Sequence, residues 1–234
     1  HRIDVQPVVA AYRAEAEEAL GRPLTWDQDD VALQNIQARA RAPMIWMLAN
    51  LQQALLVATS NRSEVAVGYA TMDGDTAGGL VPLAGIDKHF LRQWLVWAEK
   101  DCAVGLGPLP ALQKVNVQIP TAELRPPTAQ QQDEKDLMPY PLLSRIEKLW
   151  IRDRLDPLDM VPILEREFPD FTRKQLANYL IRFLQLWCRN QWKRERYAPG
   201  FQLDDESLDP KTWCRFPILS GGMQREIDQL KKIP

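Results

Sequence analysis

The sequence feature that most constrains the fold is a short apolar segment without charge, Ala-Leu-Leu-Val-Ala at residues 54–58. A helical pattern comes before it, and residues typical of helix starts follow directly after it. A short, continuous apolar segment in that setting is typical of a strand that is buried on both faces of a parallel sheet. The sequence therefore predicts an α/β fold in which polar residues lie just beyond the carboxyl end of this strand.

Helical patterns flank the apolar segment on both sides. Residues 8–20 predict a helix that ends at Gly21, because glycine commonly terminates helices. A longer helix is predicted over residues 33–51, where apolar residues recur every three or four positions. Pro43 lies inside that pattern, so we expect a kink or a break there. Another helix is predicted to begin at Asp87.

The second half of the chain combines helices with two loop-rich regions. Residues 119–139 contain four prolines and a run of glutamines, which favours a strand-poor loop that is either exposed or covers a ligand. Helices are predicted from Tyr140 onward, and a Thr-x-x-Gln capping box at Thr172 opens one of them. Pro, Gly, Asp and Ser are mixed after residue 196. We therefore divide the chain into residues 1–196 and a loop-rich tail, residues 197–234.

Strands are too few for a complete doubly wound sheet. Besides residues 54–58, only residues 115–117 offer a short β-type segment. Sheets of that kind are built from several parallel strands that alternate with helices. We therefore expect the chain to supply part of an α/β domain, followed by a largely helical region.

Charge and cysteine content exclude several classes of protein. The formal net charge is −2, so no overall basic surface for nucleic acid is expected. The sequence has no apolar run of the roughly 18–20 residues that a membrane-spanning helix needs. Its three cysteines lie far apart, which argues against a disulfide framework or a zinc site and favours a reducing compartment. We expect a cytoplasmic protein that binds neither nucleic acid nor a membrane.

Histidine is too scarce for most nucleophilic catalysis. Apart from His1, a catalytic set of the Ser-His-Asp or Cys-His type would depend on His89 alone. A lone histidine is more often structural. The sequence therefore predicts no catalytic side chain.

Polar residues with chemical potential follow the predicted strand directly. Thr59 and Ser60 can hydrogen-bond to a nucleotide, and Glu64 can hold Mg²⁺ against phosphate oxygens. Ligands of open α/β sheets bind at such strand ends. A structural interpretation competes, because Asn61-x-x-Glu64 also matches a capping box, and spacing alone favours it.

Three further polar features have ordinary explanations beside functional ones. Asp73 and Asp75 alternate with glycine and can line a ligand site or simply form turns. Lys88 can reach a phosphate, although a lone lysine is usually a surface residue. A basic cluster around Trp192 can bind an anion or complement a helix dipole. Ser-Gly-Gly at 220–222 lacks the Asp and Ser of a pyrophosphate-binding loop, and we interpret it as a turn.

Seven segments, taken in chain order, resemble the synthetase domain of glutamine-dependent NAD synthetases. They are Gln-Asn-Ile-Gln-Ala-Arg at 34–39, Ala-Thr-Ser-Asn-Arg-Ser-Glu at 58–64, Gly-Tyr-Ala-Thr-Met-Asp-Gly-Asp at 68–75, Gly-Ile-Asp-Lys at 85–88, Pro-Thr-Ala-Glu-Leu at 120–124, Gln-Asp-Glu at 132–134 and Asn-Gln-Trp-Lys at 190–193. Each is weak alone, but their order over most of the chain makes the resemblance specific.

The resemblance implies a Rossmann-like domain of the ATP pyrophosphatase type and an ATP-dependent amidation. In that family ATP activates the nicotinate carboxylate of deamido-NAD as an acyl-adenylate, and ammonia derived from glutamine then displaces AMP. ATP and Mg²⁺ are thus the implied cofactors. Deamido-NAD and ammonia or glutamine are the implied partners, and a homo-oligomer, dimer or larger, is expected.

The resemblance also implies roles for individual residues. ATP contacts fall on Thr59, Lys88 and Thr121, and a Mg²⁺ contact falls on Glu64. Contacts to deamido-NAD fall on six positions: Asn35, Arg39, Glu64, Tyr69, Met72 and Lys193. No side-chain nucleophile is implied, because ATP supplies the leaving group and the enzyme mainly positions the reactants.

The chain departs from the family pattern in two ways. Met72 and Trp192 stand where the ammonia-dependent branch often has Lys and His. The Ser-Gly-Gly-x-Asp-Ser loop and the glutaminase domain are expected upstream of residue 1, so we expect residues 1–234 alone to be inactive. Two alternatives stay open, another adenylating enzyme of the same superfamily and a non-catalytic helical interaction module.

Overall fold

The structure is a computed structural model that describes residues 2–101, 105, 107–122, 124–126, 132–218 and 220–234. In the first half the helices are α1 (Gln6–Leu20), α2 (Trp26–Arg39), α3 (Ala42–Leu51), α4 (Arg62–Val67), α5 (Lys88–Asp101), the 3₁₀ turn η1 (Pro110–Leu112) and α6 (Gln113–Asn116). In the second half they are α7 (Asp133–Asp136), α8 (Tyr140–Glu147), the π-helical turn η3 (Lys148–Arg152), α9 (Pro157–Glu167), α10 (Arg173–Arg189), α11 (Gln191–Arg194) and α12 (Gln224–Leu230).

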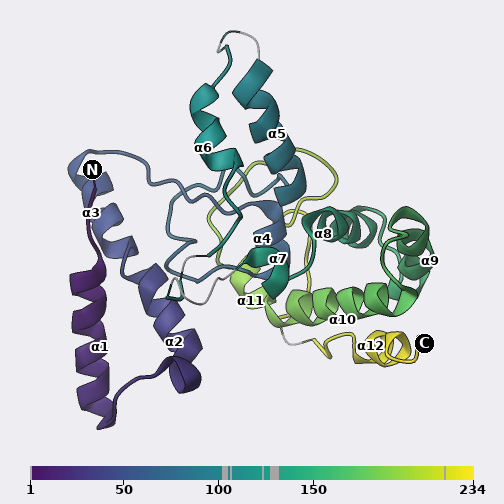
Figure 1. Cartoon of the computed structure of the whole chain (residues 1–234), viewed down its shortest axis with the longest axis horizontal. Helices are drawn as coiled ribbons and strands as arrows, with labels where there is room; N and C mark the ends of the chain where they lie inside the picture. The colour runs from purple at the N-terminus through teal and green to yellow at the C-terminus, as the bar shows by residue number, and fades with distance from the viewer. Residues whose placement is uncertain (1, 102–104, 106, 123, 127–131, 219) are drawn as a thin grey trace.

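Three groups of helices surround an irregular centre (Figure 1). Helices α1, α2 and α3 form an arm on one side, while α5 and α6 project together from the centre. Helices α8, α9, α10 and α12 form a compact body on the other side. The short helices α4, α7 and α11 lie in the centre, where the body and the two projections meet.

The hydrophobic core lies in the helical body and is organised by α10. The Thr172 capping box predicted for this helix is confirmed, since Thr172 accepts a hydrogen bond from the Gln175 backbone and Gln175 answers it. One face of α10 is buried, and it includes Trp187 near the carboxyl end of the helix, which is 1% exposed. The Trp187 ring stacks on Phe183 at 5.8 Å, and Arg194 lies over it at 4.1 Å. Side chains from α4 and α8 join the same core.

The predicted buried strand at residues 54–58 does not form. Leu55 and Val57 are 64% and 43% exposed, and within the described residues the segment makes only one isolated bridge, Val57 to Leu80. A strand in the interior of a parallel sheet pairs with neighbouring strands and is covered on both faces. Here one edge of the segment is uncovered, so its apolar side chains meet solvent instead of a sheet.

A short parallel alignment of three segments is nevertheless present. Val57 bridges Leu80, and Val81 bridges Gly200, both in parallel orientation. The tail therefore lies beside residues 80–81, which lie beside residues 57–58. The α/β prediction is correct to this extent only, because the described part of the chain is helical with bridges in place of strands.

The helix predictions are mostly confirmed. Residues 8–20 lie within α1, and Gly21 ends it in the left-handed conformation. The long helix predicted over 33–51 is two helices, because the chain breaks after α2 and Pro43 occupies the first turn of α3, where a proline is tolerated. Asp87 opens α5 as predicted. The β-type interpretation of residues 115–117 is wrong, since Val115 and Asn116 belong to α6.

The prediction of a strand-poor loop over residues 119–139 is confirmed where the structure describes it. These residues are irregular apart from α7, with Glu123 and residues 127–131 outside the described part, but the loop is not exposed throughout, because Leu137 and Met138 are buried. Residues 197–217 are irregular, and Ser220 accepts a hydrogen bond from Gly222 in a turn. Within the described residues, no helix is both long and apolar enough to cross a membrane.

Candidate functional site

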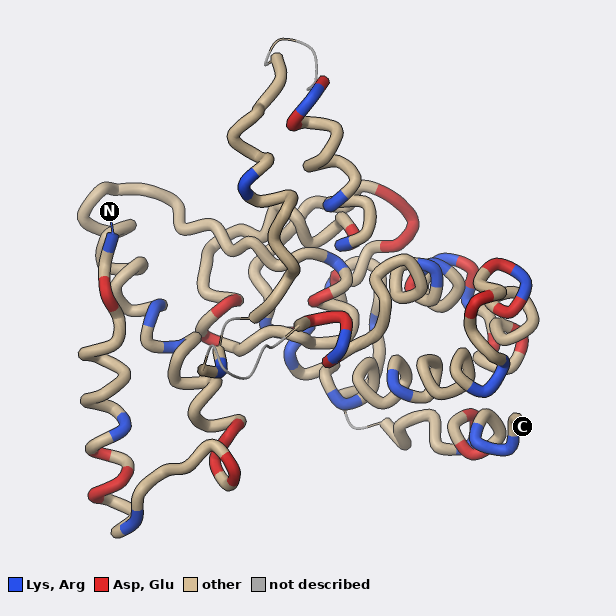
Figure 2. The backbone as a smooth tube through the Cα atoms, viewed as in Figure 1, with Lys and Arg blue, Asp and Glu red and all other residues tan. Residues whose placement is uncertain are grey.

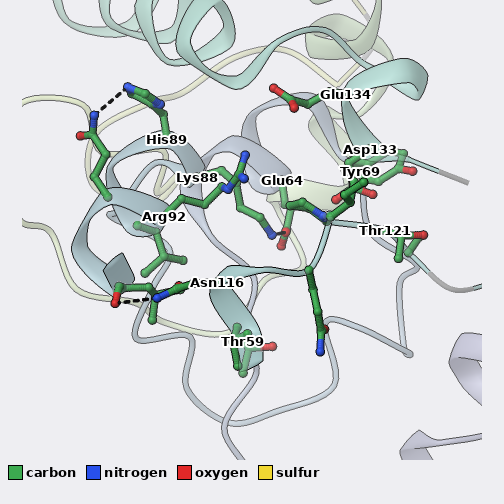
Figure 3. Close-up of a pocket in the computed structure, with 18 of the residues that line it drawn as sticks. Thr59, Glu64, Tyr69, Lys88, His89, Arg92, Asn116, Thr121, Asp133 and Glu134 are labelled. Carbon is green, nitrogen blue, oxygen red and sulfur yellow. Dashed lines mark hydrogen bonds and ion pairs between the residues drawn. The ribbon is translucent and has the colours of Figure 1, made fainter. Parts of the chain in front are cut away.

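A cavity of about 980 Å³ opens between α4, α5 and the segment that follows α6 (Figure 3). It contains five of the residues singled out in the sequence: Thr59, Glu64, Tyr69, Lys88 and Thr121. Their segments lie far apart in the chain and converge only in the fold. We call this space the large cavity.

The centre of the large cavity is an ion pair between Glu64 and Lys88. The Lys88 Nζ donates to Glu64 Oε1 at 2.9 Å, and both side chains are about one-fifth exposed. The other carboxylate oxygen, Oε2, accepts from the Asn61 backbone, while Asn61 Oδ1 accepts from the Glu64 backbone at 3.1 Å. The predicted capping box is therefore confirmed. By fixing Oε2, it also directs Oε1 of Glu64 towards Lys88.

A buried guanidinium connects the segments that carry Glu64 and Lys88. Arg62 is 3% exposed and lies among four carboxylates: Asp87, Glu147, Asp204 and Glu206. Its contacts with Glu206 and Asp204 are 2.9 and 3.0 Å long. Burial acts to lower the pKa of the guanidinium, but the surrounding acidic groups, including the Asp204 carboxylate that accepts from it, together outweigh burial and raise that pKa. Arg62 therefore keeps its charge.

Glu147 is the carboxyl of this cluster that is least able to ionise. It is fully buried, and its nearest cation is Arg62, whose Nε lies 3.6 Å from Oε2. Burial raises the pKa of Glu147 to about 8, although Arg62 and Ser63 act to lower it. Near neutral pH the Glu147 carboxyl is therefore mostly protonated.

The loop at residues 68–75 contributes Tyr69 and Asp75 to the large cavity. It begins at Gly68, whose φ of +65° is left-handed and whose added Cβ would lie 2.3 Å from the Cβ of Asn190. Asn190 in turn donates to the Val67 carbonyl at 2.8 Å. Only glycine satisfies both constraints.

Lys193 holds this loop from below. Its Nζ donates to the carbonyls of Gly68 and Ala70 at 2.7 and 2.8 Å. Burial lowers the pKa of Lys193, which is typical of an ammonium withdrawn from water. Lys193 does not line the large cavity but fixes the backbone that carries Tyr69.

Asn35 and Arg39, both on α2, hydrogen-bond to the same loop. The Thr71 hydroxyl donates to Asn35 Oδ1 at 3.1 Å, and Arg39 Nε donates to the carbonyl of Met72 at 3.0 Å. The Met72 side chain is buried. Arg39 also borders a second cavity of about 590 Å³, which includes Asp73 of the loop and Thr76 directly after it. The loop thus contributes residues to both cavities.

A buried tyrosine, Tyr140, lies behind the cavity-lining residues Lys88 and Asp133. Its hydroxyl donates to Asp133 Oδ2 at 2.8 Å, and its ring lies 6.0 Å from Lys88 Nζ. Burial, together with the nearby Asp133 carboxylate, raises the pKa of Tyr140 far above its ordinary value, so the phenol stays neutral. Asp133 is 5% exposed, and its Oδ1 has no hydrogen-bond partner among the residues that the structure describes.

Two cavity residues, Arg92 and Asn116, escaped the sequence analysis (Figure 3). His89, which the sequence analysis considered only as a catalytic histidine, lines the large cavity as well. Arg92 was recoverable, because it is four residues after Lys88 and therefore shares its helix face. Asn116 was missed because residues 115–117 were interpreted as a strand.

A protein-only metal centre is not formed by the residues that the structure describes, since no group of three or more Asp, Glu, His or Cys side chains could hold a metal ion. Glu64 is the carboxylate of the large cavity that pairs with Lys88 among the described residues, and Asp75, Asp133 and Glu134 also line the cavity. Such a site fits a cation only if a ligand supplies most of the oxygens.

The sequence of this chain is similar to that of known NAD synthetases. The family model described as NAD synthase matches residues 1–182. The glutamine-dependent NAD(+) synthetases of Aquifex aeolicus and Rhodobacter capsulatus are 31% and 34% identical over 93% and 89% of this chain. The matched stretches are 34% and 36% of the relatives' lengths, so the chain spans about a third of them.

Solved structures agree with the sequence comparison. A glutamine-dependent NAD(+) synthetase from Cytophaga hutchinsonii aligns with a TM-score of 0.82 and 45% identity, over 99% of this chain and 36% of that one. The NMN synthetase of Francisella tularensis aligns with a TM-score of 0.55 and 20% identity, over 86% of this chain and 66% of that one. At that identity the second likeness shows the fold alone.

The raised pKa of Glu147 makes stability depend on pH. The folded state favours the protonated carboxyl, so this contribution is complete below the unfolded pKa of 4.5 and is lost as pH rises towards about 8. We expect the free energy of unfolding to fall across that window by at most about 1.4 kcal/mol per pH unit. Glu147→Gln should flatten the profile in urea titrations.

The control for this prediction is Glu165→Gln, which removes an exposed carboxylate that pairs with Arg173. Its profile should run parallel to that of the unsubstituted protein. Glu206 keeps a smaller slope of the same sign, since burial also raises its pKa. Equal slopes for Glu147→Gln and the unsubstituted protein would show that Glu147 titrates normally.

Proposed function

This chain belongs to the NAD synthase family, and we propose that it forms one wall of a site in which ATP activates deamido-NAD for amidation. The reaction makes an acyl-adenylate of the nicotinate carboxylate, and ammonia then displaces AMP to give NAD. The observation that carries this proposal is the Glu64–Lys88 pair, which faces a cavity of about 980 Å³ together with Thr59, Tyr69 and Thr121. We place the chain within a Rossmann-like ATP pyrophosphatase domain, in the cytoplasm.

The large cavity suits the triphosphate of ATP. Lys88 and Arg92 lie one helical turn apart at the start of α5, and both line the cavity. Cations at that place can neutralise the charge that develops as the nicotinate carboxylate attacks the α-phosphorus. The hydroxyls of Thr59 and Thr121 lie at the same cavity and can donate to ligand oxygens.

Mg²⁺ fits this site when it is shared with the nucleotide. Glu64 would be the protein ligand, because its carboxylate faces the cavity. Binding of the metal would weaken the hydrogen bond that Glu64 accepts from Lys88. A bound Mg²⁺ would supply Lewis-acid polarisation of the phosphate oxygens. The neutral Tyr140 beneath Lys88 adds no negative charge to compete for either cation.

The loop at residues 68–75 is our proposed support for deamido-NAD. Tyr69 projects into the large cavity, while Asn35, Arg39 and Lys193 hold the loop's backbone and side chains in place. Met72 presents its carbonyl, not its buried side chain, to Arg39. We propose that Asn35, Arg39, Met72 and Lys193 act on this substrate mainly through the loop.

ATP binding tests the proposal directly. Lys88→Met should weaken the affinity for Mg·ATP about tenfold or more, because a charge-assisted contact to phosphate contributes about 1.5–3 kcal/mol. Isothermal titration calorimetry measures the dissociation constant. Lys100→Met, on the exposed last turn of the same helix, is the matched control and should bind as the unsubstituted chain does. No saturable binding by the unsubstituted chain up to millimolar ATP would refute the proposal.

The complete reaction is proposed to need more than residues 1–234. The chain spans about a third of its curated relatives, and we assign the pyrophosphate-binding loop and the ammonia-producing glutaminase domain to the remainder. We expect purified residues 1–234 to form no AMP from ATP when deamido-NAD and ammonium chloride are supplied. Chromatographic detection of deamido-NAD-dependent AMP would contradict this expectation.

Self-association is the last part of the proposal. Residues 42–61 contain no charged side chain, and α3 appears uncharged along its length in Figure 2. On α3, Trp46, Met47 and Leu51 are 40%, 49% and 73% exposed. An exposed, uncharged helix face of this kind is typical of a subunit interface. We propose that a second copy of this chain covers it.

Sedimentation velocity at micromolar concentration tests this assembly. We expect a dimer or a larger species, and we expect Met47→Glu to shift it to the monomer because a carboxylate would be buried at the interface. The control is Val96→Glu on α5, which introduces the same charge on a different exposed helix. A monomer for the unsubstituted chain would contradict the proposal.

A further inference from the structure

We propose that Arg62 is a positioning residue that couples the tail segment 204–206 to the Glu64–Lys88 pair. Its role is to set the distance and direction of Lys88 relative to Glu64 without touching a ligand. The coupling is a property of the fold, and only its effect on ATP affinity depends on the proposed function.

The first step is a set of hydrogen bonds between the start of α4 and the segment before α5, residues 85–88, which we call the α4–α5 brace. The Arg62 backbone donates to the Ile86 carbonyl at 2.8 Å, and Arg62 Nη1 donates to the Gly85 carbonyl at 3.1 Å. Ser63 Oγ accepts from the Lys88 backbone at 3.1 Å. Residues 62–63 therefore hold residues 85–88 from both backbone and side chain, directly beside the ion pair.

The second step runs through Asp87. Its Oδ2 accepts from Arg62 Nη2 at 3.2 Å, while its Oδ1 caps α5 by accepting from the Phe90 backbone at 2.9 Å. One carboxylate thus ties the guanidinium to the first turn of the helix that carries Lys88. Any shift of the guanidinium moves Asp87, and with it the turn from which Lys88 projects.

The third step is the tail. Asp204 accepts from Arg62 Nη1 through both oxygens, at 3.1 and 3.0 Å, and Glu206 Oε2 lies 2.9 Å from Nη2. Asp204 Oδ1 also accepts from the Glu206 backbone, so the two acidic residues form one small turn. The Nη2 nitrogen of the guanidinium contacts both Asp87, which caps α5, and Glu206 of the tail. Arg62 therefore links the tail to the start of α5.

The planar fork of arginine is needed for this arrangement. The guanidinium donates in several fixed directions, whereas a lysine ammonium is a compact point charge on a flexible stem. Lysine at position 62 keeps the charge but cannot reach Gly85, Asp87 and the tail together. Arg62→Lys therefore separates positioning from charge.

A merely structural role would predict a general loss of stability with no preference for Lys88. The positioning role predicts that Arg62→Lys loses its effect on ligand affinity when Lys88 is already absent. A double-mutant cycle on Arg62→Lys and Lys88→Met measures this coupling.

The first measurement uses the ligand-free chain. We expect Arg62→Lys to increase hydrogen exchange about tenfold in the peptide spanning 85–92, which contains the Lys88 and Phe90 amides, while α10 exchanges as before. Arg145→Lys is the matched control, because it disrupts a two-bond pair with Glu167 on the exposed surface. Unchanged exchange over 85–92 would overturn the proposal.

The second measurement is the affinity for Mg·ATP by calorimetry. Arg62→Lys should raise the dissociation constant about tenfold in the unsubstituted background and less than about twofold in the Lys88→Met background. Equal effects in the two backgrounds would reduce Arg62 to a structural residue. If the unsubstituted chain binds no ATP, the proposed function fails. The hydrogen-exchange result would still show whether Arg62 holds residues 85–88 in place.

A milder variant covers the case in which Arg62→Lys does not fold. Asp204→Asn alters the half-exposed tail carboxylate and leaves the buried partners in place. It should produce the same pattern at lower amplitude, with faster exchange over residues 85–92. A normal exchange rate there would remove the tail from the coupling.

Discussion

The centre of this molecule depends on burying one positive charge. A guanidinium out of water costs several kcal/mol unless it is paired and hydrogen-bonded. Arg62 is paired through Asp87 and through Asp204 and Glu206 of the tail, and Glu147 of α8 lies beside its Nε. Burial of this charge is therefore a condition on the topology, because leaving out residues 85–87 or the tail would remove part of its charge pairing. The Glu64–Lys88 pair is adjacent to this cluster in the sequence, because Glu64 is two residues after Arg62 and Lys88 directly follows Asp87.

The sequence predicted the local features of the fold well. Capping boxes at Asn61 and Thr172 and the helix stop at Gly21 depend on residues within one helical turn, and each is confirmed. The strand at residues 54–58 failed for the opposite reason. Its composition suits a sheet interior, but whether a sheet surrounds it is decided by segments distant in the sequence. Only the bridge to Leu80 forms among the residues described.

The site shows the same division. Glu64 and Lys88 were identified through the family resemblance, and their 2.9 Å contact was not readable from spacing. The sequence offered two interpretations of Glu64, as a helix cap and as a site residue; in the structure one carboxylate oxygen completes the cap and the other accepts from Lys88. Arg62 was overlooked because its partner Asp204 lies 142 positions away. Asp133 was noticed only as part of a motif, since burial of its unpaired oxygen is a property of the folded chain.

The protonated Glu147 has a thermodynamic consequence outside the site. Because its pKa is about 8 in the folded chain and 4.5 in the unfolded chain, folding at pH 7 takes up close to one proton from the surroundings. That proton comes from the buffer, so the buffer's own heat of ionisation enters any calorimetric enthalpy of unfolding. Heats measured in a buffer with a large ionisation enthalpy will differ from those in phosphate, even though the protein's conformational change is the same.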